Sequence, residues 1–159
     1  MHASACESLL PFLHPSARVL DIGSGSGYLT HVLANLVGDE GKVIGIDHIQ
    51  GLVDLARDNM EKSEDGKAML QSGKVELVKG DGRLGWPQGA PYDAIHVGAA
   101  AKELHPGLVD QLNKPGRMFI PVGENYAQYI WVVDKKEDGG IERKKLYGVQ
   151  YVPLTDAPA

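Results

Sequence analysis

Three glycines at alternate positions follow a short apolar stretch near the start of the chain, and they constrain its fold more than any other feature. The segment Val19-Leu-Asp-Ile-Gly-Ser-Gly-Ser-Gly-Tyr-Leu-Thr30 predicts a strand, a tight turn and the beginning of a helix. Because glycine has no Cβ, the backbone at Gly23, Gly25 and Gly27 can make sharp turns and lie close to a ligand. A strand, glycine-rich turn and helix in this order are typical of nucleotide-binding α/β folds.

The residues around these glycines restrict the kind of ligand. Asp21 lies two residues before Gly23, where its carboxylate would repel a pyrophosphate and attract the ammonium and sulfonium groups of S-adenosyl-L-methionine. Tyr28 stands where the dinucleotide fingerprint has its third glycine, and no lysine follows as in a phosphate-binding P-loop. The segment therefore favours S-adenosyl-L-methionine. The alternative is a glycine-rich turn that only connects a strand to a helix.

The composition is that of an ordinary globular protein. The chain has 159 residues, 43% of them hydrophobic, so we expect a single domain over residues 1–159. A formal net charge of −5 argues against a nucleic-acid partner, and no apolar run reaches the ~18 residues of a membrane span. Cys6 is the only cysteine, which excludes an internal disulfide and a cysteine-rich zinc site. We therefore expect no metal and a reducing, cytoplasmic compartment.

Apolar residues at helical spacing predict a first helix that ends before Pro15. Its buried face would carry Ala3, Cys6, Leu10 and Leu13. Further helices are expected over residues 28–37, 49–62 and 107–112, the last stopped by Asn113-Lys-Pro-Gly116.

Short apolar runs between these helices predict the strands Arg18–Ile22, Lys42–Asp47, Lys74–Lys79, Tyr92–Val97 and Arg117–Pro121. Strands that alternate with helices form right-handed βαβ units and a mostly parallel sheet. The last part of the chain differs, because two β-rich runs, Gln128–Lys136 and Lys144–Pro153, flank the turn residues Glu137-Asp-Gly-Gly140. The predicted fold class is α/β, a Rossmann-like doubly wound, mostly parallel sheet with antiparallel C-terminal strands.

Acidic residues follow two of the predicted strands. Asp47 stands 26 positions after Asp21, near the ~20-residue offset at which an acidic side chain meets a ribose diol. His48 could flank an adenine, Asp81 could accept a hydrogen bond from its amino group, and Gly82 lets the backbone approach the ring. The structural alternatives are that Asp47 caps the next helix and that Asp81 is a turn residue.

Other polar residues have simpler explanations. His96 lies inside an apolar strand, where a buried imidazole with a hydrogen-bond partner is more frequent than a catalytic base. Trp86 could pack in the core or line a pocket near Asp81. A set of basic residues is expected on the solvated faces of the hairpin, with guidance of an acidic substrate as the alternative: Lys135, Lys136, Arg143, Lys144 and Lys145.

Several segments resemble one enzyme family. Leu20-Asp-Ile-Gly-Ser-Gly-Ser-Gly27 resembles the first motif of class I methyltransferases. The longer segment Gly80-Asp-Gly-Arg-Leu-Gly-Trp-Pro-Gln-Gly-Ala-Pro-Tyr-Asp-Ala-Ile95 is similar to the signature of protein-L-isoaspartate O-methyltransferases. Further similar segments cover nearly the whole chain: Lys42-Val-Ile-Gly-Ile-Asp-His-Ile49, Asp93-Ala-Ile-His-Val-Gly-Ala-Ala100 and Tyr151-Val-Pro-Leu-Thr-Asp156.

The resemblance implies the class I methyltransferase fold and methyl transfer from S-adenosyl-L-methionine, with S-adenosyl-L-homocysteine as product. The acceptor would be the free carboxyl group of L-isoaspartyl and, less efficiently, D-aspartyl residues in aged proteins, whose ester collapses to a succinimide and allows repair. The expected partners are isoaspartyl-containing proteins and peptides, and we expect a monomer. A carboxylate is ionised at neutral pH and can attack the methyl carbon without a general base.

The resemblance also implies roles for particular residues. The family has an N-terminal region ending approximately Ser-Ala-Pro-His-Met-His-Ala, with a serine regarded as catalytic. That serine would precede Met1, so the chain is expected to be N-terminally shortened and has no assigned catalytic residue. The implied cofactor-binding residues are His2; Asp21, Gly23, Ser24, Gly25, Ser26 and Gly27 at the methionine part; Asp47 and His48 at ribose and adenine; Asp81 and Gly82 at the adenine edge; and Thr155 on the methionine or substrate side.

Three alternatives stay open at this point. The chain could bind S-adenosyl-L-methionine without turnover. It could be a nucleotide-dependent oxidoreductase, which keeps the fold and changes the cofactor. It could also methylate small molecules or RNA, which fits the first motif but not the long segment around Asp81.

Overall fold

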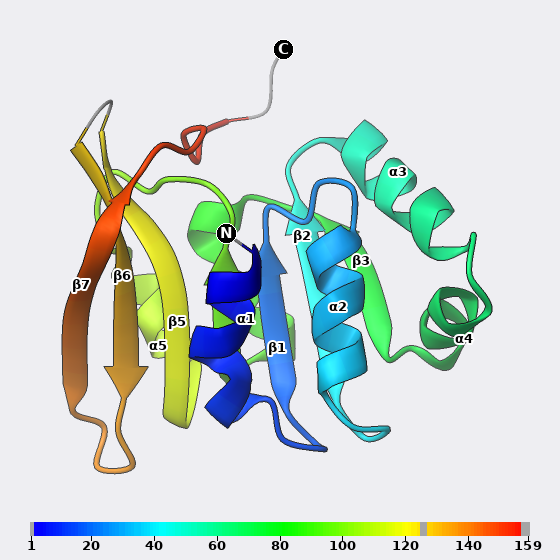
Figure 1. Cartoon of the computed structure of the whole chain (residues 1–159), viewed down its shortest axis with the longest axis horizontal. Coiled ribbons are helices and arrows are strands. Elements are labelled where there is room, and N and C mark those ends of the chain that lie inside the picture. The colour runs from blue at the N-terminus through cyan, green and yellow to red at the C-terminus, as the bar shows by residue number, and fades with distance from the viewer. Residues whose placement is uncertain (1, 125–126, 157–159) are drawn as a thin grey trace.

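A seven-stranded sheet forms the centre of the molecule within residues 2–124 and 127–156, the part of the chain that the computed structural model describes (Figure 1). The strand order across the sheet is β3-β2-β1-β4-β5-β6-β7. The strands are β1 (Arg18–Ile22), β2 (Lys42–Asp47), β3 (Val75–Lys79), β4 (Tyr92–Val97), β5 (Leu112–Glu124), β6 (Ala127–Lys135) and β7 (Ile141–Val149). The α-helices are α1 (His2–Leu9), α2 (Tyr28–Leu36), α3 (Gln50–Met60), α4 (Glu64–Ser72) and α5 (Pro106–Asp110).

The predicted fold class is confirmed. Strands β3, β2, β1, β4 and β5 are parallel to one another, whereas β6 pairs antiparallel with β5, and β7 pairs antiparallel with β6. From β1 the chain moves outward to β2 and β3 on one side and then crosses to β4 on the other. Ligands of such sheets bind beyond the carboxyl ends of the strands at this change of direction.

Apolar side chains fill both faces of the sheet. One cluster includes Val19 and Leu33 and packs the sheet against α1, α2 and α3, which lie on the same face in Figure 1. A second cluster includes Ile22, Tyr92 and Leu108 and covers the face on which α5 lies. Both clusters draw residues from β1, since successive side chains of a strand point to opposite faces.

The buried face predicted for the first helix was partly wrong, because Leu13 is buried and Cys6 packs against the core, whereas Ala3 and Leu10 are exposed. α1 and the short 3₁₀ helix Leu10–Phe12 do end before Pro15, as expected. The buried residues are Ala5, Leu9 and Leu13, spaced four apart, while Leu10 is 53% exposed. The face of the helix that packs on the sheet is therefore centred on Ala5 and Leu9.

Several element boundaries also differ from the prediction. The expected single helix over residues 49–62 is followed by a second helix, α4, whose N-cap Ser63 accepts a hydrogen bond from Gly66 N at 3.2 Å. β5 begins at Leu112 instead of Arg117, so the Asn113–Gly116 stretch belongs to the strand. β7 starts earlier than predicted and ends at Val149, because the chain then leaves the sheet.

The segment that follows β7, residues 150–156, crosses the carboxyl ends of the strands, and we call it the C-terminal strap (Figure 1). The side chain of Gln128 holds the backbone of Tyr151 through two hydrogen bonds, of 2.7 and 3.2 Å. Ala100 binds the backbone of Val152 and Leu154 at 2.8 Å each. The strap is thus fixed to both β6 and the loop after β4. Among the described residues no helix is long and apolar enough to cross a membrane.

Candidate cofactor site

Two adjoining hollows lie at the carboxyl ends of the parallel strands. The inner hollow has a volume of about 310 Å³, and its lining includes Gly23, Gly25, Asp47 and Gly82, with the C-terminal strap on one side. The outer hollow, of about 350 Å³, is lined by His48, Lys79, Gly80, Asp81, Thr155 and Asp156. His48 borders both hollows, so the two adjoin at this residue.

The glycine loop is built as the sequence predicts, with positive φ angles of +80°, +50° and +83° at Gly23, Gly25 and Gly27. A Cβ on Gly27 would lie 2.9 Å from that of Ala56, so this glycine lets α2 begin against α3. A Cβ on Gly25 would meet only the Gly23 oxygen, at 3.9 Å. Gly25 therefore leaves its backbone open toward the inner hollow, whereas Gly27 is needed for packing.

Asp47 connects the end of β2 to this loop. Its side chain is 6% exposed; Oδ2 accepts a hydrogen bond from Gly25 N at 3.0 Å, and Oδ1 accepts one from Ile49 N at 3.2 Å. The N-cap of α3 is Ile49, so Asp47 does not cap that helix. An ionised carboxylate has about four acceptor sites, so Asp47 keeps capacity for hydroxyl donors in the inner hollow.

Asp21 lies beneath the loop and lines neither hollow. It alternates with Leu20 and Ile22 along β1, so its side chain points to the opposite face, where it is 1% exposed. Thr30 Oγ1 donates to Asp21 Oδ2 at 2.7 Å, and His96 Nδ1 lies 2.8 Å from Oδ1. A direct contact between Asp21 and a cofactor thus stays a prediction that this geometry does not favour. His96 is the buried, partnered imidazole that the sequence suggested.

Asp81 is held by a residue to which the sequence reading gave no role. Arg83 donates from Nε to Asp81 Oδ1 at 3.0 Å and from Nη2 to Oδ2 at 2.7 Å, and its Nη2 also binds Asp156 of the strap. These hydrogen bonds lower the pKa of the Asp81 carboxyl below its ordinary value. Arg83 follows Asp81 by two residues in Gly80-Asp-Gly-Arg83, and this short spacing could have predicted the pair from the sequence.

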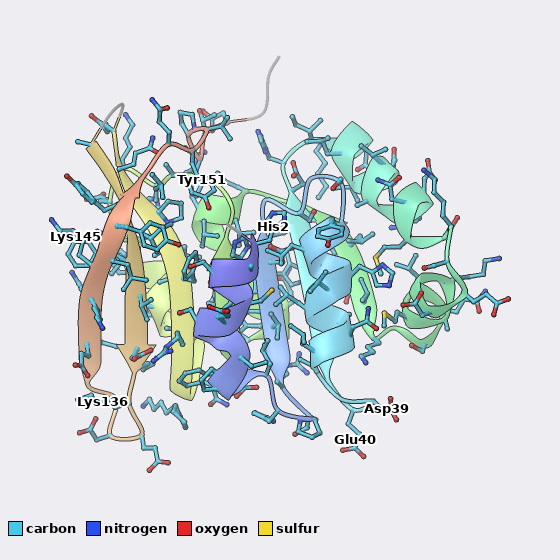
Figure 2. The ribbon with its side chains drawn as sticks, in the orientation of Figure 1. His2, Asp39, Glu40, Lys136, Lys145 and Tyr151 are labelled. Carbon is cyan, nitrogen blue, oxygen red and sulfur yellow. The ribbon has the colours of Figure 1, made fainter. Side chains whose placement is uncertain are left out.

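Of the other predicted site residues, Thr155 lines a hollow, whereas His2 does not. Thr155 lies with Asp81 and His48 in the outer hollow, beside the residues predicted for adenine rather than beside the glycine loop. His2, at the start of α1 (Figure 2), stacks on the Tyr28 ring at a centroid distance of 5.8 Å and lines neither hollow. Ser24 is buried with no hydrogen bond from Oγ to the described residues, and Ser26 is exposed. Their predicted contacts with the cofactor remain predictions.

Comparisons with known proteins agree on one family. The sequence profile described as protein-L-isoaspartate (D-aspartate) O-methyltransferase matches residues 1–159. Protein-L-isoaspartate O-methyltransferase 2 of Arabidopsis thaliana is 52% identical over 155 residues, which cover 98% of this chain and 50% of that protein. The Triticum aestivum protein-L-isoaspartate O-methyltransferase is 48% identical over 159 residues, which cover the whole chain and 68% of that protein.

A solved structure gives the same result. The chain superimposes with a TM-score of 0.88 and 30% identity on a Plasmodium falciparum structure described as a protein-L-isoaspartate O-methyltransferase in complex with S-adenosyl-L-homocysteine. The match covers 99% of this chain and 74% of that one. The chain thus spans between half and about two thirds of the lengths of the plant relatives, and it belongs to the protein-L-isoaspartate (D-aspartate) O-methyltransferase family.

Proposed function

We propose that the chain binds S-adenosyl-L-methionine in the two joined hollows and transfers its methyl group to the free carboxylate of isoaspartyl residues in proteins and peptides. The observation that carries the proposal is Asp47, a buried carboxylate hydrogen-bonded to the open glycine loop inside the inner hollow. The related Plasmodium falciparum protein, whose structure holds S-adenosyl-L-homocysteine, supports the same assignment.

The residues present fit this cofactor. The inner hollow combines the Asp47 carboxylate with apolar walls from Ile22, Ile46 and Leu52, which suits a ribose diol and the uncharged adenine joined to it. No lysine or arginine lines the inner hollow among the described residues, so a pyrophosphate there would face a carboxylate with no compensating cation. In this proposal Asp47 and His48 hold the ribose and the adjoining adenine, and Asp81 with Gly82 borders the adenine.

The main task of the chain in this reaction is to position the two reactants. When bound, the cofactor supplies a methyl group on a positively charged sulfur and leaves as a neutral thioether. The acceptor carboxylate is already ionised at neutral pH, so no residue of the chain has to remove a proton. Gly98 and Ala99 line the inner hollow and leave space for the acceptor chain, while the strap residues Val152 to Leu154 exclude water.

A methylation assay tests the proposal directly. An isoaspartyl peptide incubated with methyl-labelled cofactor is expected to gain a base-labile ester, and the same peptide with ordinary aspartate should not. Calorimetric binding of S-adenosyl-L-homocysteine without ester would instead support a cofactor-binding chain without turnover. Tight binding of NAD with none of S-adenosyl-L-homocysteine would identify an oxidoreductase and overturn the proposal.

The finer assignments belong to the same proposal. We propose a single domain that acts as a monomer in the cytoplasm, in the repair of aged proteins. The net charge of −5 supports a protein substrate over nucleic acid, and the single cysteine supports a reducing compartment. No membrane partner is proposed.

A further inference from the structure

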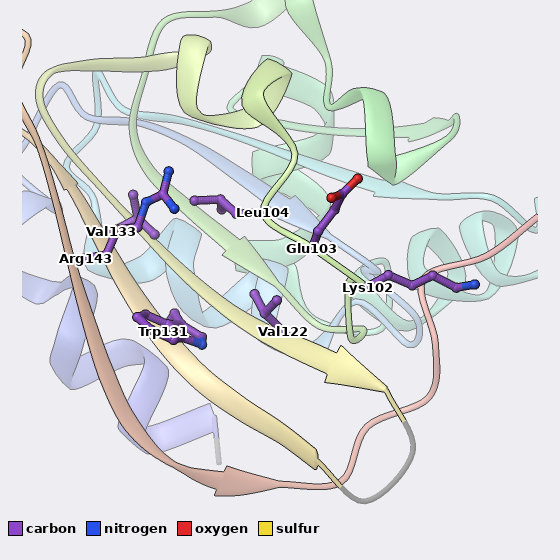
Figure 3. A pocket seen from close by; sticks show the side chains of 7 residues that line it. All are labelled: Lys102, Glu103, Leu104, Val122, Trp131, Val133 and Arg143. Carbon is purple, nitrogen blue, oxygen red and sulfur yellow. The ribbon is translucent and has the colours of Figure 1, made fainter.

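A third hollow, which we call the side hollow, lies on the face of the sheet that carries α5 (Figure 3) and shares no lining residue with the cofactor site. Its volume is about 290 Å³. Leu104, Val122, Trp131 and Val133 give it apolar walls, while Lys102 and Arg143 stand at its rim. Trp131, Val122 and Leu104 are only half-buried, so a good part of this apolar surface is open to a partner.

Arg143 presents an unused guanidinium group to the side hollow. β7 pairs Arg143 with Val133 and Lys145 with Trp131, so both basic residues belong to the face that bears the hollow. Lys145 is engaged with the Tyr129 ring, 4.4 Å from Nζ to the ring centroid. The guanidinium of Arg143 makes no ion pair or side-chain hydrogen bond with the described residues, although Glu103 lines the same hollow. Its planar group of five N–H donors is suited to a carboxylate.

The side hollow is close to the inner hollow along the chain. Ala99 lines the inner hollow and Lys102 lines the side hollow, and three residues can span no more than ~10 Å. Backbone hydrogen bonds fix this loop to β5, since Ala101 N donates to Pro121 O at 3.0 Å and Gly123 N to Ala101 O at 2.8 Å. An extended peptide crosses the same distance in about three residues.

We propose that the side hollow binds the substrate chain next to the isoaspartyl residue. An apolar side chain about three residues from the reacting residue would occupy the hollow, and a carboxylate beside it would pair with Arg143. This inference rests on the proposed function, because it takes the isoaspartyl carboxylate to react in the inner hollow. Charge complementarity at Arg143 favours this occupant, since its guanidinium has no ion-pair partner among the described residues, whereas Lys102 pairs with Glu124 at 3.5 Å.

Basic side chains on an edge strand can also serve only to prevent association of edges. Lys144 provides a matched control, because it neighbours Arg143 on β7 and faces the opposite side of the sheet, beside Asp134 and Glu142. A purely protective charge would act alike at both positions. A substrate contact would depend on Arg143 alone.

The test compares isoaspartyl peptides that carry either phenylalanine and glutamate or serine and lysine at the third and fourth residues from the isoaspartyl residue, on each side in turn. We expect a lower KM for the phenylalanine–glutamate peptide on one side. Arg143→Gln should raise that KM about two- to five-fold with kcat unchanged, the range of a partly exposed ion pair, and the difference should shrink in high salt. Lys144→Gln should leave KM unchanged.

Each other outcome has a definite meaning. Equal KM values for the two peptides, or equal effects of Arg143→Gln and Lys144→Gln, would overturn the inference while leaving the proposed function intact. If no peptide is methylated, the proposed function fails, and calorimetric binding of the same peptides to the chain loaded with S-adenosyl-L-homocysteine still tests the side hollow. A change of oligomeric state in Arg143→Gln, seen by sedimentation, would assign the hollow to a second copy and overturn the inference.

Discussion

The parallel and antiparallel parts of the sheet present their functional side chains in different ways. In β1, β2 and β4 nearly every residue is buried, and the polar groups of the candidate site follow at the strand ends. In β7 eight of nine residues are exposed, and Arg143 lies on a strand face. Strands covered on both sides leave only their ends for ligands, whereas an open edge offers its faces. The cofactor site and the side hollow follow this division.

Truncation of one isoleucine in each part gives the largest expected contrast. Ile44 in β2 is 2% exposed and Ile141 in β7 is 42% exposed. Ile44→Ala should lower the free energy of unfolding by about 2–5 kcal/mol, because it leaves a cavity in the core. Ile141→Ala should change it by less than about 0.5 kcal/mol. Urea unfolding of both variants measures the difference, and equal losses would contradict the division.

Removal of one carboxylate in each part tests where the cofactor binds. Asp47→Ala should raise the Kd for S-adenosyl-L-homocysteine on the order of 10- to 100-fold, since hydrogen bonds to a charged group contribute about 1.5–3 kcal/mol. Asp134→Ala removes a carboxylate that pairs with Arg117 in the antiparallel part, with Nε to Oδ1 at 2.6 Å. Calorimetry should show its Kd unchanged. A similar Kd for both variants would remove Asp47 from the site.

Two glycines with positive φ separate backbone strain from ligand contact. Gly25 has φ +50° and lines the inner hollow, while Gly139 has φ +86° in the turn before β7. Valine at either position should cost about 1–2 kcal/mol of stability, because its Cβ opposes this conformation. Only Gly25→Val should also weaken binding of S-adenosyl-L-homocysteine beyond the effect of unfolding. Thermal unfolding and calorimetry, run on both variants, decide this.

The smallest effect at neutral pH is expected at the seam between the two parts, where β4 pairs with β5. Burial raises the pKa of Tyr92 from 10.0 to about 12, and its hydroxyl donates to Trp86 O. The folded state therefore binds this proton more tightly than the unfolded state, so the contribution of Tyr92 to stability is fully present below pH 10 and is lost between pH 10 and 12. Tyr92→Phe should lack that part of the decline. Urea unfolding from pH 7 to 12 compares the two slopes, and identical slopes would refute the assignment.

Local sequence signals predicted the parallel part well. Uninterrupted apolar runs gave the bounds of β1, β2 and β4, and the acidic residues after consecutive strands predicted Asp47 and Asp81 at one edge. α4 was missed because it is short, begins with the charged residues Glu64 and Asp65, and includes Gly66, which favours a turn. The orientation of Asp21 was available from strand alternation alone.

The contacts that complete the site could not be predicted from the sequence. Gln128 reaches Tyr151 across 23 positions, and Arg83 reaches Asp156 across 73. Neither pair has a local pattern, because each depends on where β7 ends and on the path of the chain across the sheet. Strand alternation likewise places Arg143 and Lys145 on one face of β7. It does not tell which of the two faces carries the side hollow.

The anchoring of the C-terminal strap has a thermodynamic consequence. The strap borders both hollows of the cofactor site, yet Gln128, which fixes its beginning, belongs to β6, the strand that also carries Trp131. A peptide that displaces β6 when it docks must therefore alter the affinity for the methyl donor, and the donor must alter the affinity for the peptide by the same factor. The ratio of the peptide affinities with and without the methyl donor would measure the coupling that passes through the Gln128 side chain.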